Sequence, residues 1–403
     1  MSQFCPYTYN ASPPKLEYPW KAPMPSESER DRRWQAIRIA MNRHDIDCLI
    51  VGAPWGYMPT QTNHLYYISN YIPYSNIGTF VVFPAKGEPQ IDVSNSIGPQ
   101  FLHIALQTSW IGDVVESLHP ARQIVNKIKE LKLEKGRLGI IGYRMGVFPA
   151  VIYDAIRESL PDARFEDATG ALSEAMDEVS RTSEEEHTLL RKACEILDLS
   201  FKAVTTALRP GITENELWAV AEQAIIRNGG WYGHFMLVTS GPNPTFPKAP
   251  ASYNTLDKGD VVILELHAIY GGVSPQCCYA LSLNHPRRDV ERMFEFCKEL
   301  YDFSLVELEK NRTFLDIESD LAKRIHSAGY EPMTPQIHVY NMSVRTPMNS
   351  SPQPGDYFTV HPNICNKDFS AGAKFGDAVR ITKDGKVERL VSTPARLNII
   401  EVS

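Results

Sequence analysis

Three titratable side chains in the C-terminal half, Glu265, His338 and His361, are suited to acid–base chemistry. Imidazole titrates near neutral pH, so either histidine could act as a general acid or a general base. Two histidines and one carboxylate can also hold a single metal ion that keeps open coordination positions. These residue types leave metal-free catalysis and single-metal catalysis as alternatives.

Glu265 lies in a region where strand-like runs dominate, from Thr255 onward. Side chains two apart in a strand point to the same face, so His267 shares the face of Glu265. It could be a further metal ligand or a wall of the substrate site. Cys278 shares the face of Gln276 by the same rule. A thiolate nucleophile needs an adjacent base, and a buried inert thiol is the favoured interpretation of Cys278.

Helical and strand-like segments alternate in the N-terminal half, which indicates an α/β domain. Apolar residues at helical spacing predict the first helix. Helices are expected at 27–45 and 121–133, and strands at 47–51, 79–83, 90–93 and 137–141.

A break near Ser180 separates this half from a second set of elements. Ser183 with Glu186, and Thr213 with Glu216, have the spacing of capping boxes, which predicts that a helix begins at each. The strands beyond Thr255 are interrupted by helical patterns at 289–308 and 314–328.

Three stretches of the C-terminal half resemble the creatinase, prolidase and aminopeptidase P family. In 182–229, a capped helix, the letters RPGITENEL and a helix ending in NGG are similar to the start of its catalytic domain. In 256–279, the spacing from Glu265 to Gln276 equals that between the family's two metal-binding aspartates. In 338–384, PGDYFTVHP and AKFGD are similar to the segments that present its last two ligands. Residues 34–69, with NHLYYIS, resemble its N-terminal domain.

The resemblance implies the fold class: an α/β N-terminal domain plus an α+β pita-bread C-terminal domain, as in creatinase. The expected limits are an extended arm at 1–26, the N-terminal domain at 27–178 and the catalytic domain at 179–403. Homodimers are usual in the creatinase and prolidase branch, so a homodimer is expected.

The resemblance also identifies five positions at which the family's metallopeptidases bind two divalent metals through Asp, Asp, His, Glu and Glu. They correspond here to Glu265, Gln276, His338, His361 and Gly376. Two such metals need carboxylate oxygens to offset their charge. Only one carboxylate remains, so we expect no dinuclear centre and no cofactor. The alternative is one divalent metal ion held by Glu265, His338 and His361. Asp377 matches the second residue of the family's Glu-Asp pair and is interpreted as structural.

Further side chains are expected around the substrate from the same resemblance. Gln276, with Glu265, would orient the substrate. Lys248 falls where creatinase has its catalytic histidine, and it could bind a substrate carboxylate or act as a base. Arg345 falls where the peptidases often have a second pocket histidine, and it could bind a carboxylate with two hydrogen bonds. For Lys248, a solvated position in a loop is an equally open interpretation. For Arg345, the equally open interpretation is a structural ion pair. His234 lies in an aromatic stretch that favours core over a binding cage.

The function that follows is a creatinase-like enzyme, a hydrolase or a lyase, that cleaves a C–N or related bond. Its substrate would be a small, polar, carboxylated molecule, and its histidines and Glu265 would act without a dinuclear metal centre. Three alternatives stay open: a single-metal enzyme, an Xaa-Pro-type metallopeptidase, and a non-catalytic binding module. Fold alone does not separate them.

Composition restricts the partners. The chain has 403 residues, enough for two domains. Its net charge of −7 disfavours nucleic acid and anionic membranes. No apolar run approaches the length of a membrane span, and residues 1–25 lack the apolar core of a signal peptide. The seven cysteines match no disulfide framework or zinc motif, so we expect reduced thiols in a cytoplasmic protein.

Overall fold

The structure is a computed structural model that describes residues 23–53, 63–71, 78–93, 105–143, 148–231, 237–244, 250–338 and 349–402. For His338 it describes the backbone. The chain divides between Val179 and Ser180 into two compact units. No helix in the described ranges is long and apolar enough to cross a membrane.

The first unit contains a six-stranded mixed sheet of order β4-β3-β2-β1-β5-β6. Its strands are β1 (Cys48–Ala53), β2 (Thr79–Pro84), β3 (Gln90–Asp92), β4 (Asp113–Val115), β5 (Arg137–Ile141) and β6 (Arg164–Asp167). Its helices include α1 (Glu27–Arg43), α2 (Asn63–Ser69), α4 (Pro120–Glu130) and α5 (Ala150–Ser159). The α/β organisation predicted for this half is confirmed.

The first of these helices shows how the sequence sets its bounds. The Ser26 hydroxyl accepts a hydrogen bond from the Glu29 amide at 3.2 Å and caps the first turn of α1. Trp34, Ile37 and Met41 recur at helical spacing and are buried. The helix ends at Arg43, two residues before the predicted end.

Helix α6 (Thr169–Thr182) crosses the division between the units. Helices α7 (Glu184–Ala207) and α8 (Glu214–Arg227) belong to the second unit. The Ser183 hydroxyl accepts from the Glu186 amide at 3.0 Å. Thr213 and Glu216 form the full predicted capping box, because the Thr213 amide also donates to the Glu216 carboxylate at 2.8 Å.

The second unit is built on three sheets, of order β17-β9-β8-β7, β11-β12-β15-β16 and β10-β13-β14. The strands are β7 (Leu237–Gly241), β8 (Val261–His267), β9 (Gln276–Leu283), β10 (Glu331–Pro332), β11 (Ile337–His338), β12 (Tyr357–Val360), β13 (Asn363–Cys365), β14 (Gly372–Lys374), β15 (Asp377–Ile381), β16 (Val387–Arg389) and β17 (Leu397–Ile400). Helices α9 (Arg288–Leu308) and α10 (Phe314–Ser327) interrupt them, as predicted.

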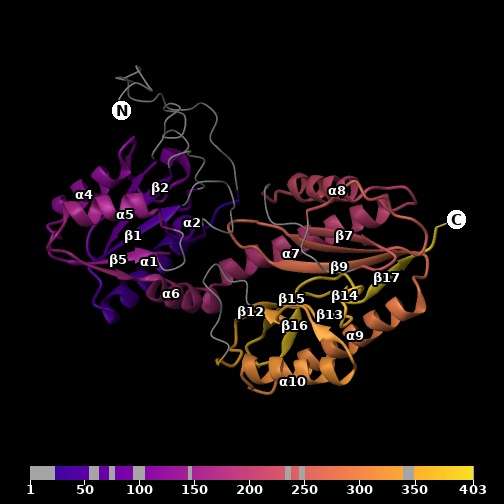
Figure 1. Ribbon diagram of the computed structural model, residues 1–403. Coiled ribbons are helices and arrows are strands. Elements are labelled where there is room, and N and C mark those ends of the chain that lie inside the picture. The colour runs from indigo at the N-terminus through magenta and orange to yellow at the C-terminus, as the bar shows by residue number, and fades with distance from the viewer. Residues whose placement is uncertain are drawn as a thin grey trace. The chain divides into compact units, whose positions relative to one another are not determined.

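The pair β8–β9 has two buried faces. Leu264 and Leu266 pack into a core with residues of α7 and α8. Ile263 and Ala280 pack into a second core with residues of α9, α10 and β12. Figure 1 shows α8 on one side of the β7–β9 layer, and β12 to β16 with α9 and α10 on the other. A polar side chain on the second face is therefore enclosed between two sheets.

Candidate active site

The register of β8 against β9 places four of the singled-out side chains on one face. Glu265 pairs with Cys278, and His267 pairs with Gln276. Directly opposed residues of an antiparallel pair point the same way. This face also carries Ile263, so it is the one that looks toward the second sheet. The predicted face-sharing within each strand agrees with this arrangement.

Glu265 is the centre of a buried polar cluster. Its Oε2 atom accepts from the Lys374 ammonium of β14 at 2.5 Å. Its Oε1 atom accepts from the Gln276 side-chain amide. Lys374 and Gln276 are fully enclosed and Glu265 is 1% exposed. The ammonium compensates the carboxylate charge, which burial alone would strongly disfavour.

Gly376 joins the two sheets at a point that leaves no room for a side chain. The Cys278 amide donates to the Gly376 carbonyl at 2.8 Å, and the Gly376 amide returns a bond to the Cys278 carbonyl at 2.9 Å. A Cβ atom added at Gly376 would lie 2.6 Å from the His361 Cβ atom, and closer still to the Val360 carbonyl oxygen. Glycine at this position is a packing requirement.

His361 follows β12 directly and is 1% exposed. Its backbone amide donates to the Gln336 carbonyl at 2.8 Å. Its Nδ1 atom lies 3.3 Å from the Nδ2 atom of Asn363, a side chain that is itself fully buried. The His361 backbone is therefore held by the segment before β11, and its ring contacts the first residue of β13.

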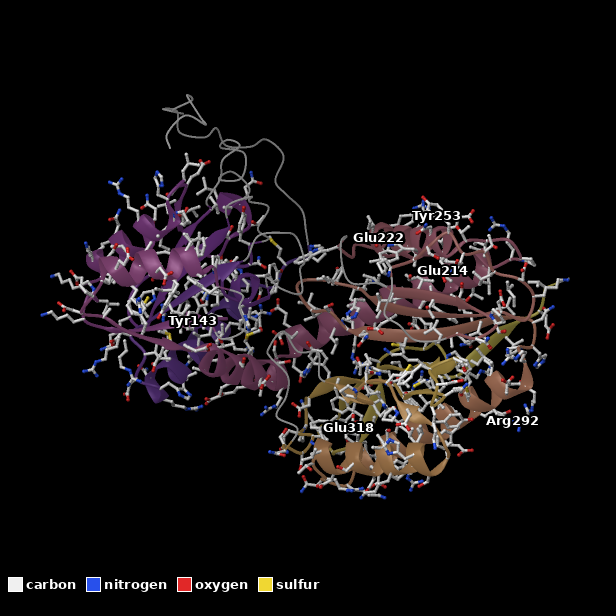
Figure 2. All side chains as sticks on the ribbon, in the orientation of Figure 1. Tyr143, Glu214, Glu222, Tyr253, Arg292 and Glu318 are labelled. Atoms are coloured by element: carbon white, nitrogen blue, oxygen red, sulfur yellow. The ribbon has the colours of Figure 1, made fainter. Side chains whose placement is uncertain are left out.

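Strand β11, which carries His338, is held by the carboxylate of Glu318 from α10, which is labelled in Figure 2. The Glu318 carboxylate accepts from the Ile337 amide at 2.6 Å. Burial raises the pKa of Glu318 to about 7, and hydrogen bonds from the Ile337 and Gln336 backbone oppose the rise only in part. The His338 backbone pairs with Thr359 of β12.

Asp377 has a role that supports its structural interpretation. Its carboxylate accepts from the Tyr301 hydroxyl at 2.5 Å and from the Arg389 guanidinium. Burial raises the pKa of Asp377, and Arg389 acts in the opposite direction.

The structure brings together only part of the predicted site. Glu265, Gln276 and His267 share a face, and His361 lies at the end of the strand next to β15. Gln276 uses its amide group on Glu265, while its Oε1 atom is buried with no hydrogen-bond partner among the described residues. Lys248, Arg345 and His234 lie outside the described residues, as does the side chain of His338.

Two members of the site were missed in the sequence: Lys374 and Asn363. Lys374 had a signal in the sequence, because a strand pattern that ran on to Gly376, two residues later, would place both residues on one face. A lysine between Ala373 and Phe375, both apolar, is also unusual for a buried strand. Asn363 had no comparable signal.

Among the side chains that the structure describes, no group of three or more His, Cys, Asp and Glu could hold a metal ion. The ligand set Glu265, His338 and His361 includes a side chain outside that description.

Comparison with known proteins gives two family matches. Residues 188–383 match the metallopeptidase family M24, and residues 33–179 match the creatinase/prolidase N-terminal domain. An Xaa-Pro dipeptidase of Lactobacillus delbrueckii subsp. lactis is 24% identical over 70% of this chain and 78% of its own length. An Xaa-Pro dipeptidase of Pyrococcus furiosus is 24% identical over 53% of this chain, and the match spans 64% of that protein.

Solved structures of similar fold cover nearly the whole chain. The prolidase from Thermococcus sibiricus matches 92% of this chain and 99% of its own, with a TM-score of 0.76 and 20% identity. The X-Pro aminopeptidase from Thermotoga maritima matches 91% and 99%, with a TM-score of 0.75 and 18% identity. The predicted fold class, an α/β domain followed by a pita-bread domain, is confirmed.

Proposed function

Because the chain belongs to the creatinase, prolidase and aminopeptidase P family of pita-bread proteins, we propose that it is a hydrolase of a C–N bond in a small polar molecule. We propose further that it works without a dinuclear metal centre. The hydrolase part has the support of relatives named Xaa-Pro dipeptidase. The metal-free part depends on the geometry of the buried cluster around Glu265.

The observation that carries the proposal is the ion pair between Lys374 and Glu265. A two-metal centre of this family needs several carboxylates to offset the metal charges. Here an ammonium already neutralises the Glu265 carboxylate, and Gln276 directs an amide N–H at the same group. Gly376 supplies no ligand and has no room for one. The described residues at these positions therefore support the proposal that two metal ions are not bound.

A single metal ion at Glu265 meets the same obstacle. Both carboxylate oxygens accept hydrogen bonds, one from Lys374 and one from Gln276. A cation at either oxygen would share that oxygen with one of these donors, and it would lie close to the Lys374 ammonium. The repulsion between like charges in a buried site disfavours that arrangement.

The chemistry that remains is acid–base catalysis at a site with a fixed positive charge. His338 or His361 would handle protons or hydrogen bonds at the reacting atoms. Lys374 and Glu265 would preorganise the charge of the site. A carboxylate on the substrate is proposed from Lys248 and Arg345, whose residue types suit it.

A second candidate is the Xaa-Pro-type metallopeptidase, which the names of the relatives favour. It requires that divalent ions bind despite the ion pair at Glu265. A single-metal enzyme and a non-catalytic binding module are the third and fourth candidates. We also retain the homodimer as a proposal, which light scattering of the purified chain would test.

The deciding experiment combines metal analysis with two substrate sets. The purified chain is assayed for bound metal by mass spectrometry. It is then assayed on Xaa-Pro dipeptides and on small N-acyl, carbamoyl or guanidino carboxylates, after dialysis against chelator and after addition of Mn²⁺ or Co²⁺. We expect no stoichiometric metal, and turnover of the second set that chelator leaves unchanged.

Different outcomes would identify the competing functions. Two metal ions per chain with chelator-sensitive dipeptide cleavage would establish the metallopeptidase. One metal ion per chain would establish the single-metal enzyme. His338→Ala and His361→Ala should abolish turnover of a true substrate. Turnover in ¹⁸O-labelled water would distinguish a hydrolase from a lyase. The label enters the product of hydrolysis and is absent from the product of elimination.

A further inference from the structure

The Asn363 side chain has an orientation set by its neighbours. Its Oδ1 atom accepts from the backbone amides of Met333 at 3.1 Å and Thr334 at 2.7 Å. Rotating the amide by half a turn would point its N–H groups at these two donors. The oxygen therefore faces the 333–334 segment, and the Nδ2 atom faces His361.

The Nδ2 atom of Asn363 lies near two carbonyl oxygens and one imidazole nitrogen. It donates to the His361 carbonyl at 3.0 Å and lies 3.4 Å from the Pro335 carbonyl and 3.3 Å from the His361 Nδ1 atom. An amide nitrogen offers hydrogens and no acceptor lone pair. A proton on the Nδ1 atom of His361 would face this donor group, so the contact favours Nδ1 as an acceptor and the ring proton on Nε2.

Gln336 holds the backbone of both His361 and Asn363 in place. The His361 amide donates to the Gln336 carbonyl at 2.8 Å, and the Asn363 amide donates to the Gln336 Oε1 atom at 2.8 Å. Gln336 is 1% exposed and in turn donates to the Thr334 carbonyl at 2.6 Å. Buried, mutually satisfied hydrogen bonds of this kind hold a group in one geometry.

We propose that Asn363 is a positioning residue that holds His361 as the neutral Nε2–H tautomer. His361 then donates a hydrogen bond through Nε2 to an oxygen of the substrate. Such a donor polarises a carbonyl and stabilises negative charge that develops on its oxygen. His361 does not act as the general base, since Nε2 already carries the proton. The role toward substrate rests on the proposed function, whereas the tautomer does not.

The test is nitrogen NMR on the full chain labelled with ¹⁵N-histidine. Two-bond ¹H–¹⁵N spectra distinguish the two neutral tautomers and the doubly protonated ring. The His361 signal is assigned by its loss in His361→Gln. We expect the Nε2–H pattern in the wild-type chain at pH 7.5, and a Nδ1–H or doubly protonated pattern in Asn363→Asp, because a carboxylate there accepts a hydrogen bond from a proton held on Nδ1.

The wild-type spectrum alone decides the tautomer, even if Asn363→Asp does not fold. A Nδ1–H or doubly protonated ring at pH 7.5 would overturn the proposal. Asn363→Ser, which keeps a small polar group, should give a mixture of tautomers; an unchanged Nε2–H pattern would show that Asn363 does not set it. The spectra need no substrate, so this result is independent of the search for the reaction.

Discussion

The Glu265 carboxylate and the Lys374 ammonium form a residue-scale unit whose members depend on each other. Removing one partner of a buried ion pair leaves an uncompensated charge, which costs about 3–5 kcal/mol. Replacing both by apolar groups of similar volume is often close to neutral. The pair is buried on both sides, so it belongs to this class.

Lys374→Met should therefore lower the free energy of unfolding by about 3–5 kcal/mol and abolish activity. The double variant Lys374→Met with Glu265→Leu should recover most of the stability and none of the activity. Denaturant unfolding of the single and double variants measures both effects. Lys298→Met, which breaks an exposed pair with Asp302, is the control and should change stability by less than about 1 kcal/mol. Wild-type stability in Lys374→Met would contradict the pairing.

Gly376 gives a second prediction at this scale. Because an added Cβ would meet the His361 and Val360 backbone, Gly376→Ala should destabilise the chain by about 1–3 kcal/mol. Gly376→Glu should be worse and should bind no metal. Gly170→Ala is the matched control, because nothing lies within 4 Å of an added Cβ there. Denaturant midpoints check all three, and a Gly376→Ala variant as stable as the wild type would refute the packing requirement.

At the scale of elements, Glu318 ties α10 to β11 and should make stability depend on pH. Burial raises the pKa of Glu318 from 4.5 to about 7, so the folded chain binds this proton more tightly than the unfolded chain. Between these two values the native state holds more protons, and stability from this group falls as pH rises. Above about pH 7 the destabilisation is fully present.

Glu318→Gln keeps an oxygen that can accept from the Ile337 amide and removes the titration. The variant should gain roughly 1–3 kcal/mol over the wild type at pH 8 and little at pH 4.5. Unfolding curves at several pH values measure the difference. Glu299→Gln, on the exposed face of α9, is the control and should change the stability at pH 8 by less than about 0.5 kcal/mol. A difference between Glu318→Gln and the wild type that does not change with pH would show that Glu318 does not titrate as described.

The bounds of helices and the faces of strands were the features that the sequence predicted best. Capping residues and helical spacing are local signals, so Thr213 with Glu216 correctly marked the start of α8. Strand period correctly placed Glu265 and His267 on one face. The approach of Lys374 to Glu265 joins residues 109 apart in the chain, and no local pattern encodes it. The contact exists only once β8 and β14 are packed together.

At the scale of the whole molecule, the order of the motifs carried the fold prediction. Each motif is weak alone, but together they require an α/β unit followed by a unit with β8, β9 and the later strands. The site was predicted less fully, because most contacts in the polar cluster around Glu265 join residues that are far apart in the sequence. His361 was singled out because PGDYFTVHP resembles the family segment that presents a metal ligand. Its interaction with Asn363 depends on how the 333–336 segment packs near it.

The cysteines of the whole molecule are expected to be reduced thiols, most of them buried in the folded chain. The sequence has seven, and the six that the structure describes, Cys48, Cys194, Cys277, Cys278, Cys297 and Cys365, are buried thiols. Burial raises the pKa of Cys48 and Cys297, which disfavours the reactive thiolate. Both barriers, enclosure and a protonated sulfur, disappear when the chain unfolds.

We expect a thiol reagent such as Ellman's to label none of these six cysteines rapidly in the native chain. It should label all seven in denaturant without added reductant. Cys5 lies outside the described residues, so Cys5→Ser is the variant in which the native count isolates the other six. Rapid labelling of that variant would show that its core opens readily. Fewer than six thiols in the unfolded variant would mean that the protein carries a disulfide, contrary to the reduced state that the cysteine spacing predicts.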